Sequence, residues 1–362
     1  MGLVLEYKKH VLNFKFAAGT SRGVLQTKEA WILKVYTKGN SNTYGLGEVS
    51  TIERLSFDYS VDFATELEEL KGELSRHELP NSTEDIYKLV NQLVSAYRPA
   101  VRFGLETALL DLLHGGEFKI FDNSFFNTQK GIPINGLIWM GDKSFMKEQI
   151  DEKIKQGYKC IKLKIGAIDF ETECELLSYV RSEYSADQLT LRVDANGAFI
   201  TQEVLKKLER LTSFDLHSIE QPIMPKQPEA MSLVCEKSQV PIALDEELIG
   251  VFDKREKINL LKDIKPQYII LKPSLVGGFA ATAEWIAIAE SQNIGWWITS
   301  ALESNIGLNA ICQFTAEYNY VGHQGLGTGQ LFDNNIHSPL AIQEDQIVYN
   351  KTLSWDYGDL GF

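Results

Sequence analysis

The sequence predicts an α/β protein in which a (β/α) barrel follows a smaller α+β unit. Short strand-like segments recur through the later, larger part of the chain, and a helical stretch follows each of them. The first 114 residues instead place all their strand-like segments before their helical ones. A chain of 362 residues with 44% hydrophobic content is long enough to bury one large core and a second, smaller one.

The N-terminal part has the pattern of a small antiparallel sheet followed by helices. Residues 1–57 alternate apolar and polar side chains around the turn-forming stretches TSRG and KGNSN, as half-exposed strands do. Residues 61–114 change to a helical pattern that ends before Gly115. The last helix of this region presents an apolar face made of Phe103, Ala108, Leu109, Leu112 and Leu113.

The rest of the chain has a regular repeat of candidate strands. These strands read PINGLIW, CIKLKIG, TLRVDAN, SIEQP, IALDE, YIILKPS, GWWITSA and, more weakly, HQGLGTG. Residues near their ends recur at intervals of 25 to 30 positions and are Asn135, Lys164, Asp194, Glu220, Asp245, Lys272, Thr299 and Leu326. Such an interval holds one strand, one helix and two loops. Eight such units close into a barrel whose active site lies at the C-terminal ends of the strands.

Three acids at the predicted strand ends indicate a metal site. Asp194, Glu220 and Asp245 end the third, fourth and fifth strands, so the barrel brings them to one mouth. Three carboxylates repel one another unless a cation neutralises them, and an all-oxygen set favours Mg²⁺ or Mn²⁺ over zinc. A single acid at a strand end is more often a helix cap or the partner of a lysine. Three acids at equivalent positions on consecutive strands favour a metal site over these single-residue roles.

Lysines flank the acids on both sides. Lys162 and Lys164 lie two positions apart on the second strand, so both point into the barrel, where an ammonium group without a role is rare. We expect Lys164, crowded by the charge of Lys162, to act as a general base. Lys162 is expected to neutralise the acids in part. Lys272, on the sixth strand, is expected to be a second acid or base or a cationic contact.

Charge and cysteine usage restrict the class of partner and the compartment. The net charge of −13 and the absence of a long basic run argue against nucleic acid or an anionic membrane surface. A small molecule is the expected partner, which the family resemblance given below makes a small anionic carboxylate substrate, and a homo-oligomer stays open. The four cysteines lack metal-binding spacing and suit reduced thiols. Neither a signal peptide nor a membrane-spanning run is found, so we expect a cytoplasmic protein.

The motifs resemble those of a known enzyme family. The runs KLKIG, VDANGAF, EQP, LDEE and LKPSLVGG are similar to the enolase superfamily, and their KxK, D, E, D, K order is similar to its muconate-lactonizing-enzyme-like subgroup. The runs INGLIWMG, SALESNIGLN and GTGQLF resemble most closely the o-succinylbenzoate synthase family of menaquinone biosynthesis. This resemblance covers nearly the whole chain.

The resemblance implies a modified, TIM-like (β/α)7β barrel with an N-terminal capping domain. It places the α+β capping domain at residues 1–130 and the catalytic barrel at 131–330, with residues 331–362 returning to the cap. It implies that Asp194, Glu220 and Asp245 bind Mg²⁺, with Mn²⁺ as an alternative, and that Lys164 is the base opposite Lys272. The substrate-binding residues expected from the cap loops and strand ends are Thr20, Arg22, Asn135, Ser300, Leu302 and Glu303. A second cap loop, around Glu48, is expected to close over the substrate.

The implied activity is that of a carbon–oxygen lyase. In a syn dehydration, 2-succinyl-6-hydroxy-2,4-cyclohexadiene-1-carboxylate becomes o-succinylbenzoate through an enediolate, with Lys164 removing the α-proton and protonating the departing hydroxyl. The metal and Lys162 hold the carboxylate, and Lys272 makes a cation–π contact. The alternatives are an N-succinylamino acid racemase, a dipeptide epimerase or a muconate cycloisomerase. A metal-binding scaffold without activity does not explain the two inward lysines. A metal-dependent phosphatase would need a glycine loop that binds phosphate at a helix N-terminus, and the sequence shows none.

Overall fold

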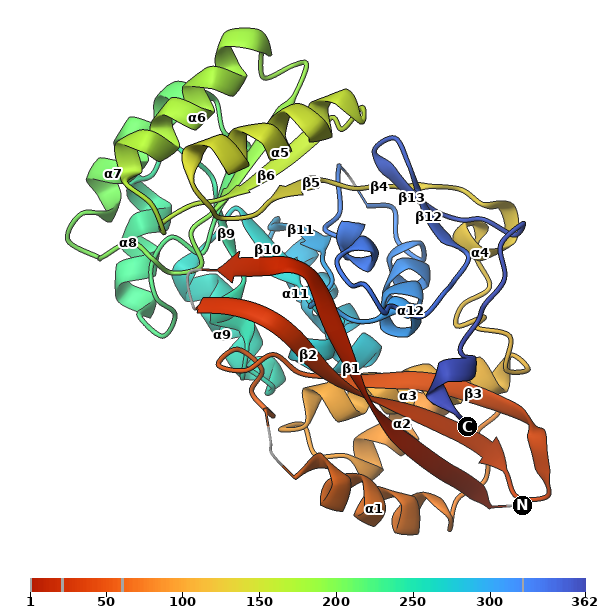
Figure 1. The fold of residues 1–362 in the computed structure, drawn as a ribbon. Coiled ribbons are helices and arrows are strands. Elements are labelled where there is room, and N and C mark those ends of the chain that lie inside the picture. The colour runs from red at the N-terminus through yellow and green to blue at the C-terminus, as the bar shows by residue number, and fades with distance from the viewer. Residues whose placement is uncertain (1, 21–22, 60–61, 321) are drawn as a thin grey trace.

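The computed structural model describes residues 2–20, 23–59, 62–320 and 322–362. It contains three sheets, with strand orders β1-β2-β3, β11-β10-β9-β8-β7-β6-β5 and β12-β13-β4. The first sheet and the helices that follow it lie beside the barrel that the second sheet forms (Figure 1). No helix in these described ranges is both long enough and apolar enough to cross a membrane.

The N-terminal unit has the predicted order of strands before helices. Its sheet is antiparallel and consists of β1 (Leu3–Thr20), β2 (Gly23–Thr37) and β3 (Asn40–Ser50). Strands β1 and β2 form a long antiparallel pair, and the C-terminal end of β1 lies next to the barrel (Figure 1). The helices are α1 (Phe63–Leu74), α2 (Thr83–Leu93) and α3 (Pro99–Leu113). The side chain of Ser82 accepts a hydrogen bond from Asp85 N and so caps the start of α2.

The barrel sheet has seven parallel strands whose alternation with helices matches the predicted repeat. The strands are β5 (Gly136–Ile138), β6 (Cys160–Lys164), β7 (Thr190–Asp194), β8 (Ser218–Glu220), β9 (Ile242–Leu244), β10 (Tyr268–Leu271) and β11 (Gly295–Ile298). The helices between and after them are α5 (Lys143–Lys155), α6 (Phe170–Glu183), α7 (Val204–Leu211), α8 (Pro228–Lys237), α9 (Lys254–Ile264), α10 (Pro273–Val276), α11 (Gly278–Ser291) and α12 (Asn305–Thr315). The α/β barrel fold is therefore confirmed.

The eighth unit differs from a regular strand. Two isolated parallel bridges, Ile134 with Gln324 and Thr299 with Gly325, close the barrel between β5 and β11. A Cβ on Gly325 would lie 2.1 Å from Thr299 Oγ1, so this close approach requires glycine. The chain then turns into a 3₁₀ helix over Gly327–Gln330. The predicted strand over HQGLGTG is thus shortened, because its glycines favour tight backbone approach and turns over an extended ladder.

The predicted first barrel strand is also shorter than the run PINGLIW. Its beginning belongs to β4 (Ile132–Pro133), which pairs with β13 (Gln346–Tyr349) outside the barrel. Strand β13 forms a hairpin with β12 (Leu340–Gln343). Pairing with the C-terminal hairpin cannot be seen from the local sequence, because the two partners lie far apart along the chain.

The last part of the chain contacts the N-terminal unit. Phe332 forms a bridge with Phe14 of β1, and the ring of Trp355 stacks on Phe118 with 3.9 Å between ring centroids. The hydroxyl groups of Tyr44 and Tyr357 are 2.9 Å apart. Figure 1 shows the C-terminus beside the N-terminal sheet. The division at residues 130 and 330 remains a prediction about domain boundaries.

Helix α3 joins the two parts of the molecule. It packs on β2 and β3 on one side and on α10 and α11 on the other. Apolar residues surround nearly the whole helix, as expected for a helix buried on all sides. One continuous cluster of buried hydrophobic side chains consequently runs from α1–α3 into the barrel, where the sequence predicted two separate cores.

Candidate active site

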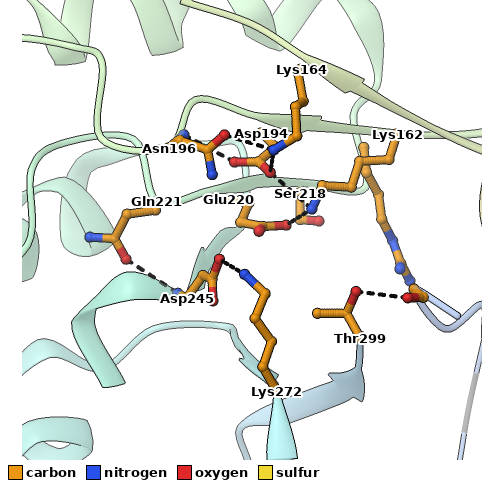
Figure 2. A network of polar contacts seen from close by, with 12 residues as sticks. Lys162, Lys164, Asp194, Asn196, Ser218, Glu220, Gln221, Asp245, Lys272 and Thr299 are labelled. Atoms are coloured by element: carbon orange, nitrogen blue, oxygen red, sulfur yellow. Dashed lines mark hydrogen bonds and ion pairs between the residues drawn. The ribbon is translucent and has the colours of Figure 1, made fainter. Parts of the chain in front are cut away.

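The parallel register places the predicted polar residues together at the barrel mouth. Lys164 at the end of β6 is paired with Asp194 on β7, which is paired with Glu220 on β8. Asp245 and Lys272 directly follow β9 and β10. Because equivalent ends of parallel strands lie side by side, these side chains point into one space (Figure 2).

The lysines and the acids form an ion-pair network. Lys162 Nζ lies 2.9 Å from Asp194 Oδ2 and also pairs with Glu220, while Lys164 Nζ lies 3.0 Å from the same oxygen of Asp194. Lys272 pairs with Asp245 on the other side of the space (Figure 2). All three acids are almost completely buried, so their charges depend on these cations.

The pKa directions show how this network divides the charge. Burial by itself would lower the pKa of Lys162, but the charges of Asp194 and Glu220 outweigh it and raise that pKa. The pKa of Lys272 is raised in the same way, mainly by Asp245 acting against burial. Burial opposes ionisation of Asp194 as well, yet Lys162 and Lys164 hold its pKa below the usual range. Lys162 and Lys272 are therefore suited to act as permanent cations.

The donor set fits a hard divalent cation. Burial and the charge of Asp194 raise the pKa of Glu220, and its Oε1 is buried without a hydrogen-bond partner in the described chain. A positive charge at this oxygen would satisfy it. In the conformation described for these ranges, no three or more His, Cys, Asp or Glu side chains gather closely enough to hold a metal, since Lys162 lies between Asp194 and Glu220. Carboxylate oxygens without nitrogen or sulfur donors match Mg²⁺ or Mn²⁺.

Two residues that the sequence analysis did not single out orient Lys164. Its Nζ donates to Asn196 Oδ1 at 2.7 Å, and Asn196 Nδ2 donates in turn to Glu246 Oε1 at 3.0 Å. Asn196 has a φ of 44°, a backbone conformation that asparagine tolerates better than most residues. Its place two positions after Asp194, in the run VDAN, was the available signal.

Gln221 is another residue of the site that was not predicted from the sequence. Its Oε1 accepts hydrogen bonds of 3.2 Å from the backbone N–H groups of Asp245 and Glu247, and its Nε2 donates to the Glu247 carboxylate at 3.1 Å. The side chain therefore ties the end of β8 to the turn that carries Asp245. The signal was a polar residue directly after Glu220 in the run EQP.

A cavity of ≈ 570 Å³ opens above the network. Its floor contains Lys162, Lys164, Asp194, Asn196 and Lys272, and its apolar wall includes Phe16, Leu25, Leu137, Trp139, Leu302 and Leu331. Strand β2 supplies Leu25 and β1 supplies Phe16, so the N-terminal hairpin forms part of the wall. A charged floor and an apolar wall suit a small anionic molecule that also has an apolar part.

The predicted substrate-binding residues have different surroundings. Asn135, Ser300 and Leu302 line the cavity, and Asn135 Oδ1 is buried without a hydrogen-bond partner among the described residues. Glu303 is fully buried behind the wall, where its carboxylate accepts hydrogen bonds from Ser274, Ser300 and Ala301. Thr20 ends β1, but its side chain lies outside the described part of the structure, as does all of Arg22.

The barrel and the lysine–carboxylate network define the class of protein. A family model described as Enolase C-terminal domain-like matches residues 145–350. The chain belongs to this family, within the enolase superfamily.

Comparison with individual relatives shows where the chain belongs within the superfamily. The o-succinylbenzoate synthase of Desulfotalea psychrophila is 47% identical, covering 94% of this chain and 97% of that protein. A crystal structure of MenC from the same organism aligns with a TM-score of 0.83 at 43% identity, covering 96% of this chain and all of the other. The N-succinylamino acid racemase of Thermus thermophilus is 27% identical over 82% of this chain and 77% of that protein. Within the superfamily, the chain therefore belongs with the o-succinylbenzoate synthases, a family of lyases.

Proposed function

We propose that this chain catalyses the Mg²⁺-dependent syn dehydration of 2-succinyl-6-hydroxy-2,4-cyclohexadiene-1-carboxylate to o-succinylbenzoate in menaquinone biosynthesis. The observation that carries the proposal is the 47% identity to an o-succinylbenzoate synthase along almost the whole chain. The lysine–carboxylate network at the strand ends supplies a mechanism for this reaction.

The reaction removes a proton from a carbon next to a carboxylate, which leaves two negative charges on one group. Asp194, Glu220 and Asp245 would hold Mg²⁺, and the bound ion would supply Lewis-acid stabilisation of that charge. Lys162 adds a second positive charge from the cavity floor, since its neighbours keep it protonated. We assign to Lys162 the binding of the substrate carboxylate.

We assign to Lys164 both proton transfers. Its Nζ is held by Asp194 and Asn196, so it reaches the cavity in a defined orientation. In its neutral form it takes the α-proton, and it then gives this proton to the hydroxyl group, which leaves as water. Both events occur on the same face of the ring because one amine performs them, and the elimination is therefore syn.

We assign to Lys272 a stabilising contact without proton transfer. Figure 2 shows Lys272 and Lys164 entering the same space from opposite sides. Asp245 keeps Lys272 positively charged despite its burial. A cation facing the flat, electron-rich ring stabilises it through a cation–π interaction.

The charge of the site suits an anionic substrate. Three lysines face three carboxylates in the network, so a bound divalent cation would leave the site positive whether Lys164 is protonated or neutral. We place the succinyl arm against Asn135, Ser300 and Leu302, which line the cavity, with Glu303 supporting this wall. By resemblance, we expect the loop that carries Thr20 and Arg22 to close over it, although Arg22 and the Thr20 side chain lie outside the described residues.

We also place the enzyme in the cytoplasm. All four cysteines are buried and unpaired, as expected in a reducing compartment. This placement agrees with a pathway that acts on small anionic metabolites.

An ultraviolet assay tests the proposed reaction directly. Purified protein is mixed with Mg²⁺ and the cyclohexadiene substrate, and appearance of the aromatic product is followed. We expect rapid, enzyme-dependent formation of o-succinylbenzoate. Absence of product with folded, Mg²⁺-loaded protein would rule the activity out.

A second candidate is racemisation of N-succinylamino acids. It is favoured by the two opposed lysines, because racemisation needs an acid and a base on opposite faces of the substrate. Exchange of the α-proton of N-succinylamino acids in D₂O measures this activity. If exchange is faster than dehydration of the cyclohexadiene, the racemase assignment replaces the synthase.

A further inference from the structure

A buried arginine lies inside the barrel, one layer further from its mouth than the carboxylates. Arg192 precedes Asp194 by two positions on β7, so both side chains point inward. It is 3% exposed. Unlike the neighbouring Lys162, which pairs with Asp194, Arg192 forms no ion pair with a carboxylate of the described residues. Because an unpaired buried charge is costly, other groups must hold this guanidinium.

The guanidinium contacts two segments on the far side of the barrel. Its Nη1 donates a hydrogen bond of 2.8 Å to the backbone carbonyl of His323. Its Cζ lies 4.1 Å from the ring centroid of Trp297 on β11, a distance that permits a cation–π interaction. Strand β7 is four strands away from β11 in the sheet order. Arg192 therefore reaches across the interior of the barrel.

The segment 323–325, which Arg192 holds, is the irregular eighth unit of the barrel. It joins the strands on either side through isolated bridges only. It also carries the backbone partners of two cavity residues. The carbonyl of Gln324 accepts a hydrogen bond from Asn135 N at 3.0 Å, and the carbonyl of Gly325 accepts one from Ser300 N at 3.0 Å. A shift of this segment would therefore displace both residues.

The second contact of Arg192 also reaches the cavity. Trp297 lines the cavity together with Asn135, Ser300 and Gly325, while Arg192 itself is not part of the lining. A guanidinium is planar and has several N–H donors, so it can stack on an indole and donate to a carbonyl at the same time. One side chain thus connects β7 to two parts of the cavity wall.

We propose that Arg192 is a positioning residue: its guanidinium holds Trp297 and the segment 323–325 across the barrel and thereby fixes Asn135 and Ser300 at the cavity. The inference rests on the proposed function, in which these two residues bind the succinyl arm. That arm is remote from the reacting carbon. Loss of Arg192 therefore weakens substrate binding more than it slows proton transfer.

The test compares Arg192→Met, which removes the donors and the charge, with Arg192→Lys, which keeps the charge. We expect Arg192→Met to raise KM for the cyclohexadiene about tenfold, the equivalent of one hydrogen bond from a charged group. Its kcat should change by about twofold or less. Arg192→Lys should recover part of the affinity, because an ammonium can donate to a carbonyl but cannot stack as a planar group.

Arg181→Met is the matched control. Arg181 of α6 also donates to backbone carbonyls, those of Phe214 at 2.7 Å and Leu189 at 2.9 Å, but it does not line the cavity. Arg181→Met should lower the temperature of unfolding and leave KM unchanged. An equal rise of KM in Arg181→Met and Arg192→Met would overturn the proposal, because a general loss of stability would then explain both.

Amide hydrogen exchange provides a readout that needs no turnover. We expect faster exchange over 298–300 and 323–327 in Arg192→Met than in the wild type and in Arg181→Met. Unchanged exchange and KM in Arg192→Met would overturn the proposal, as would a large fall of kcat at the wild-type KM. An inactive wild type would contradict the proposed reaction instead, and exchange would still decide the role of Arg192.

If Arg192→Met does not fold, Gln324→Leu loosens the same segment from its other side. Gln324 Oε1 accepts a hydrogen bond of 2.8 Å from Ile298 N, and leucine cannot replace this acceptor. The same rise of KM and the same faster exchange over 298–300 are expected. A Gln324→Leu enzyme with wild-type KM and wild-type exchange would show that the segment does not position the wall, and the proposal would be wrong.

Discussion

The carboxyl groups at the barrel mouth and those on helix α3 are buried to the same degree but have different neighbours. Asp194 and Glu220 are 1% and 2% exposed, and Glu106 and Asp111 of α3 are 0% and 1% exposed. At the mouth, each acid has a lysine within ion-pair distance. On α3, backbone N–H groups are the principal hydrogen-bond donors: Phe279 N to Glu106 and Leu46 N to Asp111.

The different neighbours change the protonation state of the buried carboxyl groups. Burial raises the pKa of Glu106 to about 8 and that of Asp111 to about 7, and hydrogen bonds from backbone N–H groups offset it only in part. At the mouth, two lysines overcome the same burial and hold the pKa of Asp194 low. Two lysines thus favour the charged form of Asp194, whereas Glu220, which pairs with Lys162 alone, has a raised pKa. Backbone dipoles alone leave Glu106 and Asp111 with raised pKa values as well.

The largest effect is expected at the lysines of the mouth. Lys164→Ala should reduce dehydration by about 10³-fold or more, because we assign both proton transfers to this amine. Lys272→Arg, which keeps the charge, should retain more activity than Lys164→Arg, in which a guanidinium cannot exchange protons. The ultraviolet assay measures all three. Higher activity in Lys164→Arg than in Lys272→Arg would reverse the roles assigned to the two lysines.

Removal of the metal should lower the rate of dehydration almost as much as the loss of the Lys164 amine does. Excess chelator should abolish turnover, and Mg²⁺ or Mn²⁺ should restore it, whereas zinc should do so poorly. Bound cation should also raise the temperature of unfolding, since it binds the folded state. Calorimetry with and without Mg²⁺ checks this. Full activity in chelator would remove the metal from the mechanism.

A smaller effect, on stability, is expected at Glu106. Its pKa rises from 4.5 in the unfolded chain to about 8 in the folded one, so the folded state binds more protons between these values. The wild type should therefore lose stability as the pH rises from 5 to 8, and Glu106→Gln should lose less, because Asp111 still titrates in this range but Glu106 no longer does. Between pH 5 and pH 8, the difference in the free energy of unfolding between Glu106→Gln and the wild type is expected to grow by about a few kcal/mol, which is the order set by such a pKa shift.

Urea unfolding at both pH values measures this difference. The variants should have similar stability at pH 5, and Glu106→Gln should be the more stable one at pH 8. Gln keeps an acceptor for the backbone N–H of Phe279, so a general loss of packing does not confuse the result. Parallel pH profiles would show that Glu106 keeps its charge in the folded protein.

The smallest effect is expected for an exposed pair. Lys143 Nζ lies 2.5 Å from Glu175 Oε2, but the two side chains are 53% and 61% exposed. Water and salt screen such a pair, so Lys143→Ala should leave the unfolding midpoint unchanged within experimental error. A large loss would mean that surface charges stabilise this protein as much as the buried networks do.

The register of the barrel explains why much of the site could be predicted. Asp194, Glu220 and Asp245 recur with the strand–helix repeat, and parallel strands place equivalent ends side by side. The eighth strand, predicted more weakly than the others, is reduced to two bridging residues, because Gly325 packs against Thr299. Thr299 and Gly325 belong to different segments of the chain, and the hydrophobic period of each segment does not show that the two residues meet.

The orientation of the predicted residues could not be derived from the sequence. Glu303 was expected to bind substrate, yet the fold places it behind Ser300, where it supports the wall. Asn196 and Gln221 were visible only as polar residues after an acid. Their partners, Glu246 and Glu247, follow another strand, so only the closed barrel brings them within hydrogen-bond distance.

The sequence by itself determined the order of the elements, the barrel and the set of charged groups at its mouth, because hydrophobic period and residue spacing are local properties of the chain. Only the tertiary structure decided which charges meet. Glu48 and Ser304 are separated by 256 positions, and they meet only because the N-terminal sheet lies on the barrel. Interaction between charges depends on distance and burial in the folded protein, and spacing along the chain sets neither.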